Sequence, residues 1–140
     1  MVDIERLLVA LLRNHSDINA VLDEKIYAEL PEGVSRPVCR LTRLPGLPRT
    51  SAQPPWLSRP SVDFDVWGVT KIEAFTAMSI VQEVLLAQPR TQTFWDYGEL
   101  VYVSATDPMY LPDPDWPDSK GRPGPRYHMT TRITAHPTRS

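Results

Sequence analysis

Hydrophobic residues near the start of the chain recur at the spacing of a helix. Over residues 3–14, apolar side chains repeat every three or four positions and charged residues fill the rest of the helical wheel. The apolar positions are Ile4, Leu7, Leu8, Leu11 and Leu12. Asp3 is placed to cap this helix. The pattern predicts an amphipathic helix over residues 3–14, then a second short helical turn from Ser16 or Asp17.

Alternating apolar and polar residues predict strands along the rest of the chain. In SVDFDVW, for example, Val62, Phe64 and Val66 fall on one side, whereas Asp63, Asp65 and Trp67 fall on the other. The same reasoning predicts strands at residues 25–31, 38–44, 99–105 and 126–135, with a further extended stretch at residues 93–97 before a turn at Gly98.

A second helix is predicted after the strand that Gly68 ends. Thr70 and Glu73 have the spacing of a capping box, in which two side chains satisfy free amides at the helix start. The apolar positions that follow predict a helix from Lys71 to about Ala87, and Pro89 is expected to mark its end.

The order of these elements predicts an α+β fold. We expect one domain over residues 1–140, with a mainly antiparallel sheet of about four to five strands. Two main helices would pack on one face of the sheet and leave the other face polar.

Proline is abundant and clustered, with 15 residues in a chain of 140. Five prolines lie between Pro45 and Pro60, and six lie between Pro108 and Pro125. Because proline lacks an amide donor and fixes φ, it is excluded from helix interiors and central strands. Both windows are therefore predicted to be long, stiffened loops.

Composition excludes several classes of protein. The formal net charge of −2 argues against a general electrostatic binder of nucleic acid. The N-terminal apolar run is short and carries Asp3 and Glu5, so we expect neither a signal peptide nor a membrane span. A single cysteine, Cys39, cannot form an internal disulfide, which favours a reducing cytosol.

Asp63 and Asp65 raise the question of an enzyme. Alternate residues on a strand are ~7 Å apart, a spacing that suits a catalytic carboxylate pair. Catalysis also needs a pocket and a shifted pKa, and the neighbouring residues suggest neither. We favour a solvated or interface-facing strand side, with a small hydrolase using Asp63 and Asp65 as the rival interpretation.

Metal and cofactor motifs are absent from the sequence. His15, His128 and His136 lack metal-ligand spacing, and Cys39 is expected to be a small core residue. Asp113, Asp115 and Asp118 form D-x-D-x-x-D without the glycine and glutamate of a calcium loop, so a solvated acidic loop is expected. No phosphate-binding glycine motif is present, and no cofactor is predicted.

Charge is uneven between the two proline-rich windows. Residues 31–60 hold five arginines against one glutamate, or +4, whereas residues 106–125 hold two basic residues against four aspartates, or −2. Each window also carries a tryptophan, and arginine and tryptophan are enriched at protein interfaces. We therefore predict a head-to-tail contact in which the basic loop of one subunit meets the acidic loop of its neighbour, or else two unrelated solvent loops. The predicted interface residues are Arg40, Arg43, Arg49, Trp56, Arg59, Asp113, Asp115, Trp116 and Asp118.

Landmarks across most of the chain resemble the tail terminator, or tail completion, proteins of bacteriophages with long non-contractile tails. The N-terminal helix IERLLVALLRNH leads into KIYAELPEGVSRPVCRL, where the family has an "IY…P" segment before a strand. VDFDVWGVTKIEAFTAMSIVQEVL matches a strand that ends in an aromatic–small turn and enters a long helix. The loop from Asp107 to Pro125 is longer than this family leads us to expect.

The resemblance implies a virion structural protein without catalytic activity. Such proteins form a hexameric ring at the head-proximal end of the tail, stop polymerisation of the tail tube and offer a surface to the head. The implied partners are other copies of the chain, the major tail tube protein and a head–tail connector or head completion protein, with assembly in the host cytoplasm and no membrane. Genomic DNA would pass through the ring without sequence-specific binding, and Asp63 and Asp65 would face that channel or an adjoining subunit. A head completion or neck connector protein is the nearest alternative.

Overall fold

The computed structural model describes residues 3–45, 58–91 and 98–136, apart from the side chains of residues 90 and 91. Three helices and six strands make up this part of the chain, which confirms the predicted α+β fold. In chain order they are α1 (Ile4–Arg13), α2 (Ser16–Leu22), β1 (Ile26–Tyr27), β2 (Val38–Leu44), β3 (Ser61–Trp67), α3 (Lys71–Thr91), β4 (Glu99–Ala105), β5 (Met109–Tyr110) and β6 (Arg126–His136). Among the described helices, none has the apolar length that a bilayer crossing requires.

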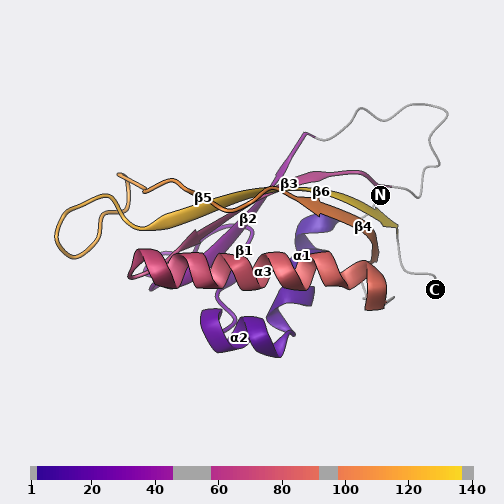
Figure 1. Cartoon of the computed structure of the whole chain (residues 1–140), viewed down its shortest axis with the longest axis horizontal. Coiled ribbons are helices and arrows are strands. Elements are labelled where there is room, and N and C mark those ends of the chain that lie inside the picture. Colours follow the sequence, from indigo (N-terminus) through magenta and orange to yellow (C-terminus); the bar gives the residue numbers. More distant parts are fainter. Residues whose placement is uncertain (1–2, 46–57, 92–97, 137–140) are drawn as a thin grey trace.

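The sheet is mainly antiparallel, as predicted. Its strands follow the order β1-β2-β3-β6-β4, and β5 pairs separately with β6. Only β1 runs parallel to its neighbour, β2. The described sheet has six strands against the predicted four to five, because β5 was not predicted. The strand predicted at residues 25–31 is shorter than expected and forms only the two-residue β1. All three helices lie on the same side of the sheet, which leaves the other face open (Figure 1).

The core lies between the helices and the sheet. The predicted apolar stripe of α1 is fully confirmed, since all five of its members are buried. They pack with the apolar positions of the central strands, including Phe64 and Met129. Each large aliphatic side chain buried in this way contributes about 1.5–3 kcal/mol. Asp3 caps α1 as predicted by accepting a hydrogen bond from the amide of Arg6 at 3.3 Å.

The predicted capping box starts α3. The amide of Glu73 donates to Thr70 Oγ1 at 3.1 Å, and Glu73 Oε1 accepts from the amide of Val69 at 2.8 Å. The predicted end of this helix is wrong, because α3 continues through Pro89 to Thr91. Proline costs the helix one amide donor, but Leu85 and Gln88 in the preceding turn are buried against the rest of the fold and hold the last turn in place.

Residues 106–125 form an arm that extends beyond the end of the sheet (Figure 1). The second proline-rich window was expected to be a loop, yet β5 pairs with the start of β6, and Asp113 forms a β-bridge with Gly124. The prolines lie at positions where the strand pairing requires no backbone amide donor. In the first proline-rich window, residues 46–57 lie outside the described part of the chain.

Candidate functional site

The open face of the sheet carries the polar residues that the strand pattern predicted. On β6, His128, Thr130 and Arg132 alternate with buried positions, as expected. The predicted side of β3 is not solvated at Asp65 and Trp67, which are 6% and 2% exposed, whereas the Asp63 side chain remains 20% exposed. Side chains of the neighbouring strands bond Asp65, and residues of the arm contact Trp67, so this end of the face is a packed polar cluster.

Asp63 and Asp65 lie on either side of His128, which faces them from β6. His128 Nδ1 is 2.9 Å from Asp65 Oδ1, and His128 Nε2 is 3.7 Å from Asp63 Oδ2. Arg40 Nη2 donates to the second oxygen of Asp65 at 3.1 Å. Asp65 is thus paired with the cationic side chain of Arg40, and the imidazole of His128 lies between the two aspartates.

Three of these side chains follow the order of a hydroxyl-nucleophile triad. Asp65 bonds to one nitrogen of His128, and Thr130 Oγ1 lies 3.5 Å from the other. Thr130 Oγ1, however, donates at 2.8 Å to Asp63, so its proton points to a carboxylate and away from the base that a triad requires. Four grooves on the described surface are lined by other residues, and none of these four borders Asp63 or Asp65. The geometry therefore favours a stabilising cluster.

A second cluster fixes the arm to the open face. Trp67 Nε1 donates to Asp113 Oδ2 at 2.8 Å, and the rings of Trp67 and Trp116 are 5.5 Å apart. Arg36 lies over the Trp116 ring at 4.4 Å and donates to the Trp116 carbonyl at 2.6 Å. Cation–π contacts of this kind contribute about 0.5–2 kcal/mol each. We call these residues the arm anchor.

The structure gives several predicted interface residues partners within the chain. Arg40 pairs with Asp65, and Asp113 lies 3.9 Å from Arg126 while bonding Trp67. Asp113 is buried, so the expectation of a solvated loop is wrong at this position. These internal pairs account for part of the charge asymmetry seen in the sequence.

The remaining predicted residues are more exposed. Asp115 is exposed, and its amide donates to Asp113 Oδ1. Asp118 bonds Arg122 at 3.1 Å; burial raises the pKa of Asp118, but hydrogen bonds from Arg122 and Lys120 and the Arg122 charge bring it below its ordinary value. Arg43 and Arg59 lie on the surface, whereas Arg49 and Trp56 fall outside the described residues.

A groove of about 360 Å³ lies at the β4 end of the open face and contains two arginines. Arg59 and Arg132 line it together with residues that carry hydroxyl groups, and no acidic residue contributes to its walls. The remaining lining residues are Pro45, Ser61, Tyr102, Ser104, Ile133 and Thr134. Sequence reasoning missed this basic groove because only strand pairing brings Arg132 opposite Ser61 and Ser104.

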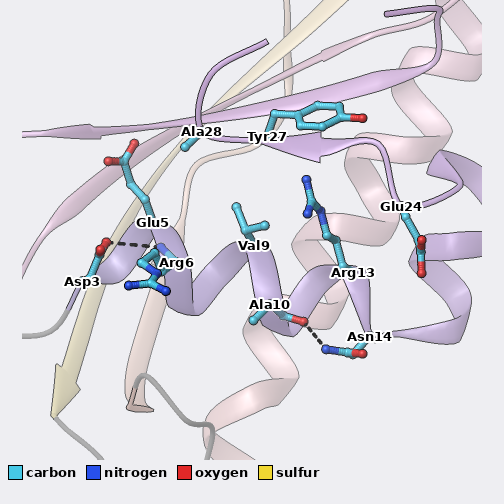
Figure 2. A pocket seen from close by; sticks show the side chains of 10 residues that line it. All are labelled: Asp3, Glu5, Arg6, Val9, Ala10, Arg13, Asn14, Glu24, Tyr27 and Ala28. Carbon is cyan, nitrogen blue, oxygen red and sulfur yellow. Dashed lines mark hydrogen bonds between the residues drawn. The ribbon is translucent and has the colours of Figure 1, made fainter. Parts of the chain in front are cut away.

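A larger groove of about 640 Å³ runs between α1 and the free edge of β1 (Figure 2). Figure 2 shows Asp3 and Glu5 at one end and Glu24 at the other, with Arg13 between them. Arg13 lies over the Tyr27 ring at 5.1 Å, and its guanidinium donates twice to the carbonyl of Ile26. Arg13 thereby satisfies a backbone acceptor of β1, whose outer edge has no strand partner among the described residues.

The described residues include neither an activated cysteine nucleophile nor a cluster of metal ligands. Cys39 is a buried core residue, as predicted, and burial raises the pKa of its thiol far above the ordinary value. Its thiolate form is therefore disfavoured. Within residues 3–45, 58–91 and 98–136, no group of three or more His, Cys, Asp or Glu side chains is placed to hold a metal ion.

Comparison with solved structures relates this architecture to a virion component. One similar chain comes from the virion of a native gene transfer agent (GTA) particle, with a TM-score of 0.64 and 13% sequence identity. The match covers 95% of this chain and 94% of that chain. The two chains share a fold. No protein-family model matches the sequence, and no curated protein does either.

Proposed function

We propose that this chain is a structural protein of a virion, in which copies assemble into a ring at the head-proximal end of the tail. The observation that carries the proposal is the shared fold with a chain of the GTA virion, which extends over 95% of this sequence. The resemblance of the IY…P and DVW segments to tail terminators supports the tail position. In this role the ring, most simply a hexamer, ends polymerisation of the tail tube and provides the surface to which the head attaches.

The chemistry of the open face is consistent with a structural role. Asp65, His128 and Thr130 bond to one another or to adjacent strands, so their polar groups stabilise the sheet. A reactive site instead needs a group held ready for substrate in a pocket. The polar cluster and the arm anchor give a rigid surface suited to contacts with other proteins.

The proposed partners follow from this position. They are other copies of the chain, the major tail tube protein and a head–tail connector or head completion protein. Genomic DNA passes through the ring without sequence-specific contacts. Of the two aspartates proposed to face the channel or a neighbour, Asp63 has the more exposed side chain, at 20% against 9% for Asp65.

Deleting the gene for this chain from the genome that encodes the particle tests whether the protein terminates the tail. Without a terminator the tube continues to polymerise, so tails should exceed their normal length and remain unattached to heads. Electron micrographs of lysates give the tail-length distribution, and expression of the wild-type chain from a plasmid should restore it.

The same experiment separates the nearest alternative. A neck connector or head completion protein acts after the tail is finished, so its deletion would leave tails of normal length that fail to join heads. That result would contradict termination while keeping a structural role in the virion.

A further inference from the structure

The two outer edges of the sheet differ in charge. One edge is β1, and the other is β4, with three strands between them. At ~4.8 Å per strand, the two edges are roughly 19 Å apart. Each edge therefore presents a separate surface to neighbouring molecules.

The β1 edge is acidic. Residues 3–32 contain seven acidic residues against three basic ones, a balance of −4. Four of the carboxylates lie within five residues of β1 in the sequence and are exposed, and none makes an ion pair with a described residue. These four, which we call the acidic edge, are Asp23, Glu24, Glu29 and Glu32.

The basic groove at the β4 end has the opposite character. The side chains of Arg59 and Arg132 are exposed, and neither makes a hydrogen bond or ion pair with any residue that the structure describes. Elsewhere on this face the arginines are already engaged, Arg40 by Asp65 and Arg126 by Asp113 and the carbonyl of Leu111. The basic groove thus offers two guanidinium groups and several hydroxyls for a carboxylate, a ligand that arginine binds with two parallel hydrogen bonds.

We propose that the basic groove binds the acidic edge of a second copy of this chain. The inference rests on the proposed ring and identifies its subunit contact. Repulsion between like charges disfavours a contact of two acidic edges or of two basic grooves, whereas a contact between an acidic edge and a basic groove is attractive. A dimer formed in this way keeps one free acidic edge and one free basic groove. Such a contact is heterologous, and repeating it closes a ring when the rotation between subunits allows.

DNA phosphate is a weaker fit to the same groove. Duplex binding depends on many phosphate contacts along a surface. Beyond the groove, the open face presents arginines that are already paired and the carboxylate of Asp63. The chain itself supplies excess carboxylates at the opposite edge, so a second copy satisfies the groove more completely.

Charge reversal on each side tests this contact in the full-length protein. The groove variant is Arg59→Glu with Arg132→Glu, the edge variant is Glu24→Lys with Glu29→Lys, and a third chain carries all four changes. Sedimentation velocity over a concentration series, at low and high salt, measures self-association. Lys120→Glu and Glu83→Lys are matched controls, because both residues are exposed and lie outside the two surfaces. Circular dichroism establishes that every variant is folded.

The proposal expects each two-site variant to weaken association by at least about tenfold, with neither control doing so. An equimolar mixture of the groove and edge variants should associate, and the four-site chain should recover self-association. Association of the wild type should also weaken as salt rises. This reciprocal rescue identifies the two surfaces as partners.

Three results would overturn the inference. Variants that associate as the wild type does would place the contact elsewhere, while tail termination, tested by tail length, would still stand. A wild-type chain that stays monomeric at its highest soluble concentration would also contradict it. The third result is binding of a DNA duplex or inorganic phosphate to the groove that Arg132→Glu abolishes, together with a four-site chain that fails to recover self-association.

Discussion

At Asp65, the strand alternation correctly predicts the face but not the environment. The carboxylate points away from the helices, yet Arg40 and His128 bond it from the two adjacent strands and leave it 6% exposed. A period of two shows which side a residue takes, whereas burial depends on what packs over that side. Here the covering residues come from positions distant in sequence, so the pattern alone carried no sign of them.

Replacing Asp65 with alanine should therefore destabilise the fold. The change leaves Arg40 and His128 without their acceptor, and a partly buried unpaired group costs about 1–3 kcal/mol. Urea unfolding of the variant and wild type measures the difference, with Asp107→Ala as the control because Asp107 is exposed. Equal stability of both variants would contradict a stabilising role for the polar cluster. If the wild type turned over a small substrate and a folded Asp65→Asn protein did not, the rival hydrolase would be supported.

Among the elements, the arm departs furthest from its predicted form. Proline content predicted a loop, but Asp113 and Gly124 pair through two backbone hydrogen bonds of 2.8 Å, and the arm anchor packs against the sheet. The backbone at Gly124 passes so close to the Trp116 carbonyl and the Arg36 guanidinium that a Cβ would collide with both. Glycine is thus required there by contact with neighbouring atoms.

Substituting Gly124 with alanine should loosen the arm. The added methyl group must displace backbone and part of the arm anchor, and overpacking of this kind costs about 1–3 kcal/mol. Amide hydrogen exchange of residues 109–124 should accelerate, while exchange in α1 stays as in the wild type. Ser119→Ala, an exposed change in the same arm, is the control, and an unchanged exchange rate in the glycine variant would contradict the packing argument.

At the scale of the whole molecule, local patterns predicted the elements better than the surfaces. The helical stripe of α1, the alternation of β6 and the Thr70–Glu73 capping box each depend on neighbours in sequence, and all three are confirmed. The extension of α3 past Pro89 depends on tertiary packing, which overrides the local cost of proline. The basic groove depends on strand pairing, which joins Arg59 to Arg132 across more than seventy positions and leaves no sequence signal.

The charge asymmetry also looks different once the chain is folded. Sequence counting assigned the acidic partner to residues 106–125, but Asp113 and Asp118 have internal partners there. Four exposed carboxylates without an ion pair to a described residue lie around β1, at the opposite edge from the basic groove. The predicted head-to-tail arrangement remains our proposal, with its acidic surface moved to the β1 edge.

Locating the chain within the assembled particle tests the central claim most directly. An epitope-tagged chain can be introduced into the particle, labelled with antibody and imaged by electron microscopy, followed by reconstruction of the tail at the label. The account predicts one ring of density at the head-proximal end of the tail, into which this fold fits in repeated copies. The proposed position would be contradicted by label along the tail shaft, by label on the head shell, or by purified particles that lack the chain.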